Sequence, residues 1–155
     1  MKKLSLCSLI VAALVSGCGG HDHSTHDHGN VCDNSTDTVP FELGMSLTST
    51  DSKFTITVDT VDPNPIDRGL NTWTIALTDA NGSAVSDATV VLEPTMPGHG
   101  HGTSPATFSA TNESNGSYSM GPFNLMMPGT WLLTFTVTDA TGADSTVTVA
   151  YCIES

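Results

Sequence analysis

The sequence predicts an all-β protein built as an antiparallel β-sandwich of about seven strands. Short runs in which apolar and polar residues alternate recur from Lys53 to the end of the chain, and a period of two is typical of half-buried strands. Turn signals such as Asp79-Ala-Asn-Gly82 separate these runs roughly every 8–12 residues. Only 13% of the residues are charged, and Ser, Thr and Gly are frequent, as in exported all-β domains.

The expected strands follow one another along this region. They cover residues 54–58, 73–77, 88–92, 106–110, 116–120, 131–137 and 145–153. A further edge strand is expected within residues 41–47, where apolar residues also alternate. Pro94, Pro122 and the other prolines of the region are expected at strand ends, because proline cannot donate a hydrogen bond to a neighbouring strand.

The length and the charge of the chain limit its classes of function. With 155 residues there is room for one globular domain and short appendages. Sixteen acidic residues against four basic ones give a net charge of −12, which excludes nucleic acid as a partner because phosphate binding needs a basic surface. The sequence has no glycine-rich phosphate loop, carboxylate pair or nucleophile–base motif, so we do not expect an enzyme.

Residues 1–17 are expected to be a signal peptide. Lys2 and Lys3 precede an apolar stretch over residues 4–15, which is too short to span a bilayer. The stretch ends Leu14-Val15-Ser16-Gly17-Cys18, which resembles a bacterial lipobox and implies cleavage before a lipidated Cys18. Because Gly19 follows, the resemblance implies an outer-membrane lipoprotein that faces the periplasm. The alternatives are ordinary secretion with a free Cys18, or an uncleaved anchor.

The four cysteines predict one disulfide. Cys7 leaves with the signal peptide and Cys18 is used for lipid, so Cys32 and Cys152 are left as a pair. In an oxidising compartment such a pair is expected to be bridged. Two unpaired thiols, or two copper ligands, are the alternatives.

Residues 18–40 are expected to form a lipidated, histidine-rich tail and linker ahead of a folded domain at 41–155. The tail carries His21, His23, His26 and His28 without the apolar residues that a core requires. Tracts of this kind bind Cu(II), Zn(II) or Ni(II) loosely. We therefore expect an unselective metal-binding tail, with zinc among its ions. A Cys32–Cys152 bridge would hold the base of the tail close to the end of the last strand.

Two loops of the expected sandwich carry methionine and histidine. The candidate ligands are Met96, His99 and His101 in the first loop, Met126 and Met127 in the second, and Met120 on the strand before the second. Successive antiparallel strands reverse direction, so loops alternate between the two ends of a sandwich. Counting strands in this way places both loops, together with Cys152, at the same end.

These side chains predict a copper site. A thioether is a soft, neutral ligand that prefers Cu(I), and imidazole binds Cu(I), Cu(II) and Zn(II). Histidines combined with methionines therefore point to copper, as Cu(I) or as Cu(II). The alternative for Met120, Met126 and Met127 is a role as core filler, whereas Met96 stands among Pro and Gly, where a core role is less natural. The alternative for the two histidines is a position on an exposed loop without a ligand role.

Five short elements occur in order between residues 69 and 138. They are Asn71-Thr-Trp-Thr-Ile-Ala-Leu-Thr-Asp79, Asp87-Ala-Thr-Val90, Met96-Pro-Gly-His99-Gly, Asn115-Gly-Ser-Tyr118 and Met127-Pro-Gly-Thr-Trp131. Together they resemble the YtkA-like family, which is related to the FixH family. The resemblance implies an immunoglobulin-like sandwich on the exported side of the membrane, often beside metal-handling or oxidase-assembly proteins. FixH-like proteins bring a transmembrane anchor, whereas this chain has a lipobox.

The sequence therefore predicts an envelope lipoprotein that binds copper and acts as a copper chaperone, buffer or resistance factor. Met96, His99 and His101, with Met126 or Met127, are the expected first ligands. The expected partners are the metal ion, the membrane through the lipid anchor, and an envelope protein for metal transfer or assembly. Two other functions stay open: an accessory sandwich whose loops contact a protein, and a zinc-scavenging lipoprotein that uses the tail.

Overall fold

The computed structural model describes residues 31–32 and 36–154, and within them the protein is all-β, as predicted. Ten strands and one short 3₁₀ helix are present in these ranges, without an α-helix. The elements are β1 (Ser46–Thr48), β2 (Phe54–Asp62), β3 (Gly69–Asp79), β4 (Thr89–Met96), η1 (Pro97–His99), β5 (His101–Gly102), β6 (Phe108–Ser109), β7 (Thr111–Ser114), β8 (Ser117–Leu125), β9 (Gly129–Thr138) and β10 (Asp144–Ile153). In this part of the chain, no helix has the length and apolar character needed to cross a membrane.

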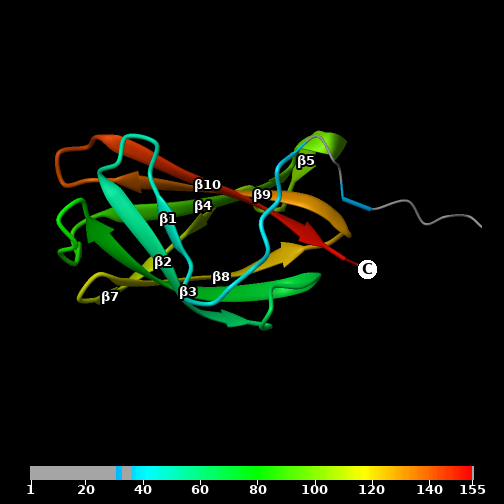
Figure 1. Ribbon diagram of the computed structural model, residues 1–155, viewed down its shortest axis with the longest axis horizontal. Coiled ribbons are helices and arrows are strands. Elements are labelled where there is room, and N and C mark those ends of the chain that lie inside the picture. The colour runs from blue at the N-terminus through cyan, green and yellow to red at the C-terminus, as the bar shows by residue number, and fades with distance from the viewer. Residues whose placement is uncertain (1–30, 33–35, 155) are drawn as a thin grey trace, which may run out of the picture.

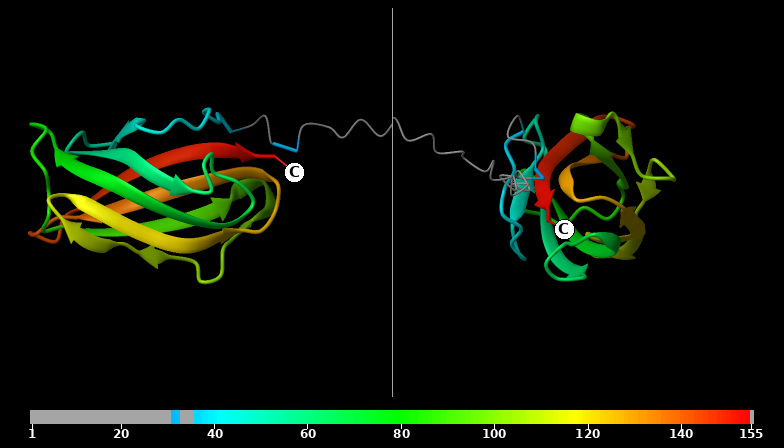
Figure 2. Two further views of the ribbon diagram at one scale, coloured as in Figure 1. Left: turned by 90° about the horizontal axis from the view of Figure 1, so that it is seen from below. Right: turned by 90° about the vertical axis from the view of Figure 1, so that its right-hand side faces the viewer.

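The strands form two antiparallel sheets that pack face to face as an immunoglobulin-like sandwich (Figure 1). One sheet has the strand order β1-β2-β3-β8-β7. The other has the order β10-β9-β4-β5, and β6 also pairs with β4. The end-on view of Figure 2 shows the two layers on opposite sides of the core. The predicted fold class is therefore confirmed.

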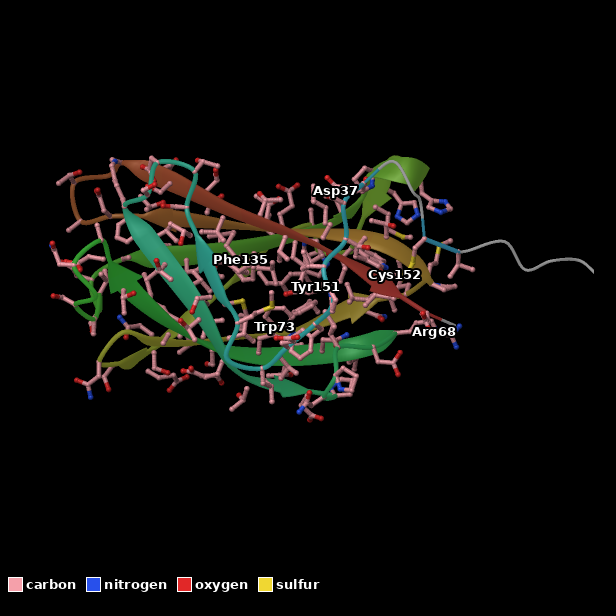
Figure 3. All side chains as sticks on the ribbon, viewed as in Figure 1. Asp37, Arg68, Trp73, Phe135, Tyr151 and Cys152 are labelled. Atoms are coloured by element: carbon pink, nitrogen blue, oxygen red, sulfur yellow. A yellow bond between two sulfur atoms is a disulfide. The ribbon has the colours of Figure 1, made fainter. Side chains whose placement is uncertain are left out.

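Alternation along the long strands builds the core. Trp73 is fully buried on β3, and its ring centroid lies 6.0 Å from that of Phe123 on β8. Phe135 on β9 and Tyr151 on β10 approach the same indole from the other sheet, at 6.1 and 6.2 Å (Figure 3). Aromatic side chains bury the largest apolar areas, so this cluster joins the two sheets near the middle of the sandwich.

The N-terminal strand is shorter than the pattern over residues 41–47 predicts. Residues 42–45 form a turn in which the Met45 N–H donates to the Glu42 carbonyl at 3.2 Å, and Gly44 has a φ of +80°. A turn requires this left-handed conformation of glycine, so β1 begins only at Ser46. Preceding it, the segment at residues 38–41 crosses the front of the molecule (Figure 1).

This N-terminal part of the chain also covers the outer edge of β10. The Val39 N–H donates to the Ala150 carbonyl at 2.9 Å, and the Thr50 N–H donates to the Thr146 carbonyl at 3.0 Å. Carbonyl groups of an edge strand would otherwise be open to pairing with another chain. The edge is therefore occupied at two points along its length.

The strand expected over residues 106–110 is divided between the sheets. Only β6 pairs with β4, and the Ala110 N–H makes a last bond to the Val90 carbonyl at 2.8 Å. The chain then joins the other sheet as β7, whose four residues are all exposed. A strand with no buried side chains has no alternating pattern, so the sequence could not predict it.

The expectation that all prolines lie at strand ends is wrong for Pro94 and Pro122. Pro94 is inside β4, and its carbonyl accepts a bond from the Thr103 N–H at 3.3 Å on the side away from β9. Its nitrogen faces the same side. At this point of β4, Pro94 lies between the residues that pair with β6 and those that pair with β5, so the missing N–H removes no hydrogen bond between strands. Pro122 is inside β8, beyond the last pair with β7 and opposite the irregular register of β3.

Strand pairing brings both Met/His loops to one end of the sandwich, here called the loop end. Thr95 near the end of β4 pairs with Leu132 near the start of β9, and Ile153 at the end of β10 pairs with Gly129. The loop after β4, the turn before β9 and Cys152 therefore share this end, at the right of Figure 1. The prediction from strand counting is confirmed.

Candidate metal site

The first loop presents its two histidines through a tight 3₁₀ turn. Pro97 opens η1, and Gly100 closes it in the left-handed conformation at φ +67°, with its N–H donating to the Met96 carbonyl at 3.0 Å. The chain then folds back along β4, so that His101 pairs with Met96. Gly102 lies so close to β4 that a Cβ atom would stand 2.6 Å from the Pro94 carbonyl oxygen. The short return is therefore possible only with glycine at position 102.

This turn places the imidazoles of His99 and His101 beside each other. Both residues are exposed, and their ring centroids are 5.7 Å apart with the planes inclined by 49°. Two imidazoles that share one metal ion at about 2.1 Å place their ring centroids roughly 5–6 Å apart. The observed pair is therefore already near the spacing needed to chelate one ion.

The ring of His101 is oriented by its surroundings. It packs edge-on against the buried indole of Trp131, with centroids 6.5 Å apart and an interplanar angle of 74°. Its Nδ1 atom lies 3.4 Å from the Gly102 carbonyl oxygen, which leaves Nε2 as the nitrogen directed away from the backbone. A metal-binding histidine commonly uses its second nitrogen on a backbone carbonyl in this way.

Trp131 also connects the histidine loop to the methionine turn. Its indole N–H donates to the Met127 carbonyl at 2.9 Å, so residues 126–128 are fixed beside the ring that supports His101. Met126 and Met127 are 50% and 37% exposed. Trp131 was not predicted as part of the site, although it ends the fifth of the elements that resemble the YtkA-like family.

The other two candidate methionines are buried. Met120 is 3% exposed and pairs with Trp73 well inside the sheet, which fits the core-filler alternative. Met96 is 1% exposed and lies under the loop, where its terminal methyl group comes within 2.8 Å of the position that a Cβ on Gly129 would occupy. The structure therefore brings His99, His101, Met126 and Met127 to the surface of the loop end, with Met96 below them.

The predicted disulfide between Cys32 and Cys152 is confirmed, with Cα atoms 5.5 Å apart. Cys152 pairs with Thr130, and the carbonyl oxygen of Val31 lies 3.4 Å from the same Cβ position on Gly129. The base of the N-terminal tail is thus held directly beside Met96. Figure 3 shows Cys152 at this end of the molecule.

Several predictions fall outside the described residues. These are the signal peptide at 1–17, the lipidation site Cys18, and the tail histidines His21, His23, His26 and His28. Within residues 31–32 and 36–154, no group of three or more His, Cys, Asp or Glu side chains is arranged to hold a metal ion. The donors that the folded domain does bring together are the two imidazoles, and Trp131 links them to the turn that carries Met126 and Met127.

A groove of about 590 Å³ lies between the N-terminal segment, the β2–β3 loop and the end of β10. Its lining includes Pro40, Phe41, Ile66, Tyr151 and Glu154. These residues come from three distant stretches of the chain, so the sequence alone could not indicate the groove. Cys152 lines it as well, which makes the disulfide common to the groove and the loop end.

Comparison with known families agrees with the sequence resemblance. A family model described as YtkA-like matches residues 49–136, which is more than half of the chain. The match begins ahead of Gly69, where the resemblance was seen to start, and covers the chain from β2 to Thr136 in β9. It therefore includes both Met/His segments and Trp131. No curated protein matches the chain.

Proposed function

The chain belongs to the YtkA-like family, and from the loop end of its sandwich we propose that it is a copper-binding protein of the bacterial envelope. It acts as a copper chaperone, buffer or resistance factor. The single observation that carries the proposal is the pair of exposed imidazoles with ring centroids 5.7 Å apart. Trp131, which packs against His101, also donates to the Met127 carbonyl, and the proposal takes its sulfur ligand from this methionine turn.

The donor set selects the metal. His99 and His101 give two nitrogen ligands, and Met127 gives a neutral thioether from the turn next to Trp131. Two imidazoles and one thioether suit Cu(I), which accepts soft ligands and low coordination numbers, better than Zn(II) or Ca²⁺. Met126 is the alternative sulfur ligand, and buried Met96 supports the loop from below. The net charge of −12 favours the approach of cations to the molecule.

The tail is proposed to collect metal for the folded domain. Val31 lies against Gly129, so the chain that carries the four tail histidines begins next to the candidate site. Linking a weak binder to a second site raises the local concentration of ligand at that site. With a lipid on Cys18, the protein works at the membrane surface and hands copper to an envelope partner. Zinc is among the ions that the tail binds.

The test is a Cu(I) competition with a chromogenic chelator under anaerobic conditions. It uses the loop-only protein, defined as residues 18–155 with Cys18→Ser and with His21, His23, His26 and His28 each changed to Asn. We expect one Cu(I) per chain, loss of that copper in His99→Ala/His101→Ala, and at least a tenfold weaker affinity in Met127→Leu. Met120→Leu removes a buried thioether near Trp73 and is the matched control, with unchanged affinity.

Copper retained by the double histidine variant would place the metal elsewhere and end the proposal. A second function is favoured by the groove of about 590 Å³, whose lining combines apolar and aromatic side chains with acidic ones and fits an accessory module that binds a protein segment. Val39→Arg would place a charged side chain in that groove at an exposed position that belongs neither to the buried core nor to the Met/His loops. An envelope phenotype that follows Val39→Arg rather than the histidine variant would favour the accessory role over copper binding.

A further inference from the structure

The folded domain supplies only two of the four ligands that a tetrahedral metal ion needs. Structural Zn(II) sites hold the ion tetrahedrally with four protein ligands, chiefly Cys, His and carboxylate groups. His99 and His101 supply two, and the part of the chain that the structure describes contains no cluster of three such side chains. The thioethers that complete a Cu(I) site are poor ligands for Zn(II).

We propose that Zn(II) joins two copies of this chain at their loop ends, with His99 and His101 of each copy as its four ligands. This proposal uses the same imidazole pair as the proposed copper site but adds a partner, a second copy, without which the zinc site is incomplete. Copper then leaves the protein monomeric, because Met127 completes that site within one chain. The metal determines the state of assembly.

The loop is open to the approach of a second copy. Both histidines are exposed, and a Cβ built on Gly100 between them meets no atom within 4 Å. The pair is held at 5.7 Å by the backbone of η1 and β5, so little ordering is needed when the ion binds. Two such pairs related by a twofold axis give a closed dimer, the commonest form of homo-oligomer.

Exposed apolar side chains also lie at the loop end, where such a dimer would form its contact. Met126 and Met127 are 50% and 37% exposed on the adjoining turn. Val31 is 45% exposed where it lies against Gly129, and Leu70, 63% exposed, starts β3 at the same end. Four of the six exposed large hydrophobic residues among those described therefore gather at the loop end.

The charge of the chain also favours a metal at the junction. Each copy carries a net charge of −12, so two copies repel each other. An ion bound by four neutral imidazoles keeps its charge of +2 between them and reduces this repulsion. Added salt screens the rest of the repulsion, so the zinc-linked dimer should be stronger at moderate than at low ionic strength.

Sedimentation velocity of the loop-only protein tests the proposal, with EDTA, with Zn(II) or with anaerobic Cu(I). We expect a monomer in EDTA and in Cu(I), and a dimer with Zn(II) that saturates at half an equivalent of metal and reverts in EDTA. His99→Ala and His101→Ala should each abolish the dimer. Met127→Leu should keep it while weakening Cu(I), which separates failure of this proposal from failure of the copper site.

Three results would overturn the proposal. One is a monomer that binds a full equivalent of Zn(II) in the loop-only protein. Another is a zinc-dependent dimer that persists when both loop histidines are replaced. The third is a dimer that forms only when the tail histidines are present, because the tail and not the second loop would then supply the missing ligands.

Discussion

Gly129 couples the core to the loop end through a single backbone position. Its φ of +131° lies in a region that side chains rarely adopt, and a Cβ there would stand 2.8 Å from the terminal methyl group of Met96. The carbonyl of Val31 closes the same space from outside. Met96 can therefore lie buried under the histidine loop only because residue 129 has no side chain.

Gly129→Ala should lower the free energy of unfolding by about 1–3 kcal/mol, because it adds both backbone strain and a crowded contact. Gly142→Ala is the matched control, since Gly142 also has a positive φ, of +82°, but open space around its Cβ position. Chemical denaturation measures both variants. Combining Gly129→Ala with Met96→Ala should recover part of the loss, and strictly additive effects of the two changes would contradict the contact.

The burial and pairing of individual residues could be predicted only in part from the sequence. The pairing of Cys32 with Cys152 followed from elimination among four cysteines, and the structure confirms it. The burial of Met96 did not follow, because its neighbours in sequence are Pro and Gly and the space it fills is created by Gly129. The residues next to Met96 in sequence indicate a loop, whereas Gly129, against which Met96 packs, lies 33 positions further along the chain.

At the scale of elements, the turn that begins with Asp79 was predictable because its chemistry is local, and the turn that begins with Asp139 is built in the same way. Each carboxylate accepts backbone N–H groups two and four residues further on: Asn81 and Ser83 for Asp79, Thr141 and Ala143 for Asp139. These bonds lower the pKa of Asp79, whereas the pKa of Asp139 is lowered first by a hydrogen bond from the Thr141 hydroxyl and then by the backbone N–H groups. β6 and β7 were not predictable in this way, because β6 has only two residues and every residue of β7 is exposed.

The disulfide is the element-scale bond with the largest expected effect on stability. It joins residues 120 positions apart, and closing so long a loop should stabilise the fold by roughly 4–5 kcal/mol on the chain-entropy model. Cys32→Ser/Cys152→Ser should therefore unfold at a much lower denaturant concentration. The wild-type protein in excess reductant is the control and should match the double variant. Identical unfolding with and without reductant would contradict this assignment.

Over the whole molecule, Asp51 links the first hairpin to the last strand. Its carboxylate accepts hydrogen bonds from the Ser49 hydroxyl at 2.7 Å and from the Ser145 hydroxyl of β10 at 2.8 Å. Lys53 adds an ion pair at 3.3 Å. The bond from Ser49 first, and then the bond from Ser145, hold the pKa of Asp51 well below its usual range.

This lowered pKa predicts how stability depends on pH. The folded state favours the ionised carboxylate, so its contribution is complete above the unfolded pKa of about 3.9 and is lost as the pH falls below that value. Asp51→Asn should be less stable than the wild type at pH 7, and the difference should shrink by pH 2. Denaturant midpoints measured across this range test it, with the exposed Asp59→Asn as control. A constant difference at all pH values would contradict the assignment.

The architecture was predictable as a whole, while its finer connections were not. The alternation around Trp73 and Trp131 identified the buried faces, and strand counting placed the two Met/His loops at one end. The strand containing Pro122 continues past the expected end at residue 120, because β3 pairs with it as far as Leu125. The candidate site could be located from the sequence, but the spacing of its imidazoles required coordinates.

The covered edge of β10 has a consequence for the shape of any larger assembly. The bonds from Val39 and Thr50 occupy that edge, so β10 is a poor template for continuing the sheet sideways into another molecule. Contacts at the loop end instead align two molecules along their long axes. A pair formed in this way is a rod of nearly double length, so small-angle scattering would show a large rise in maximum dimension and little change in cross-section.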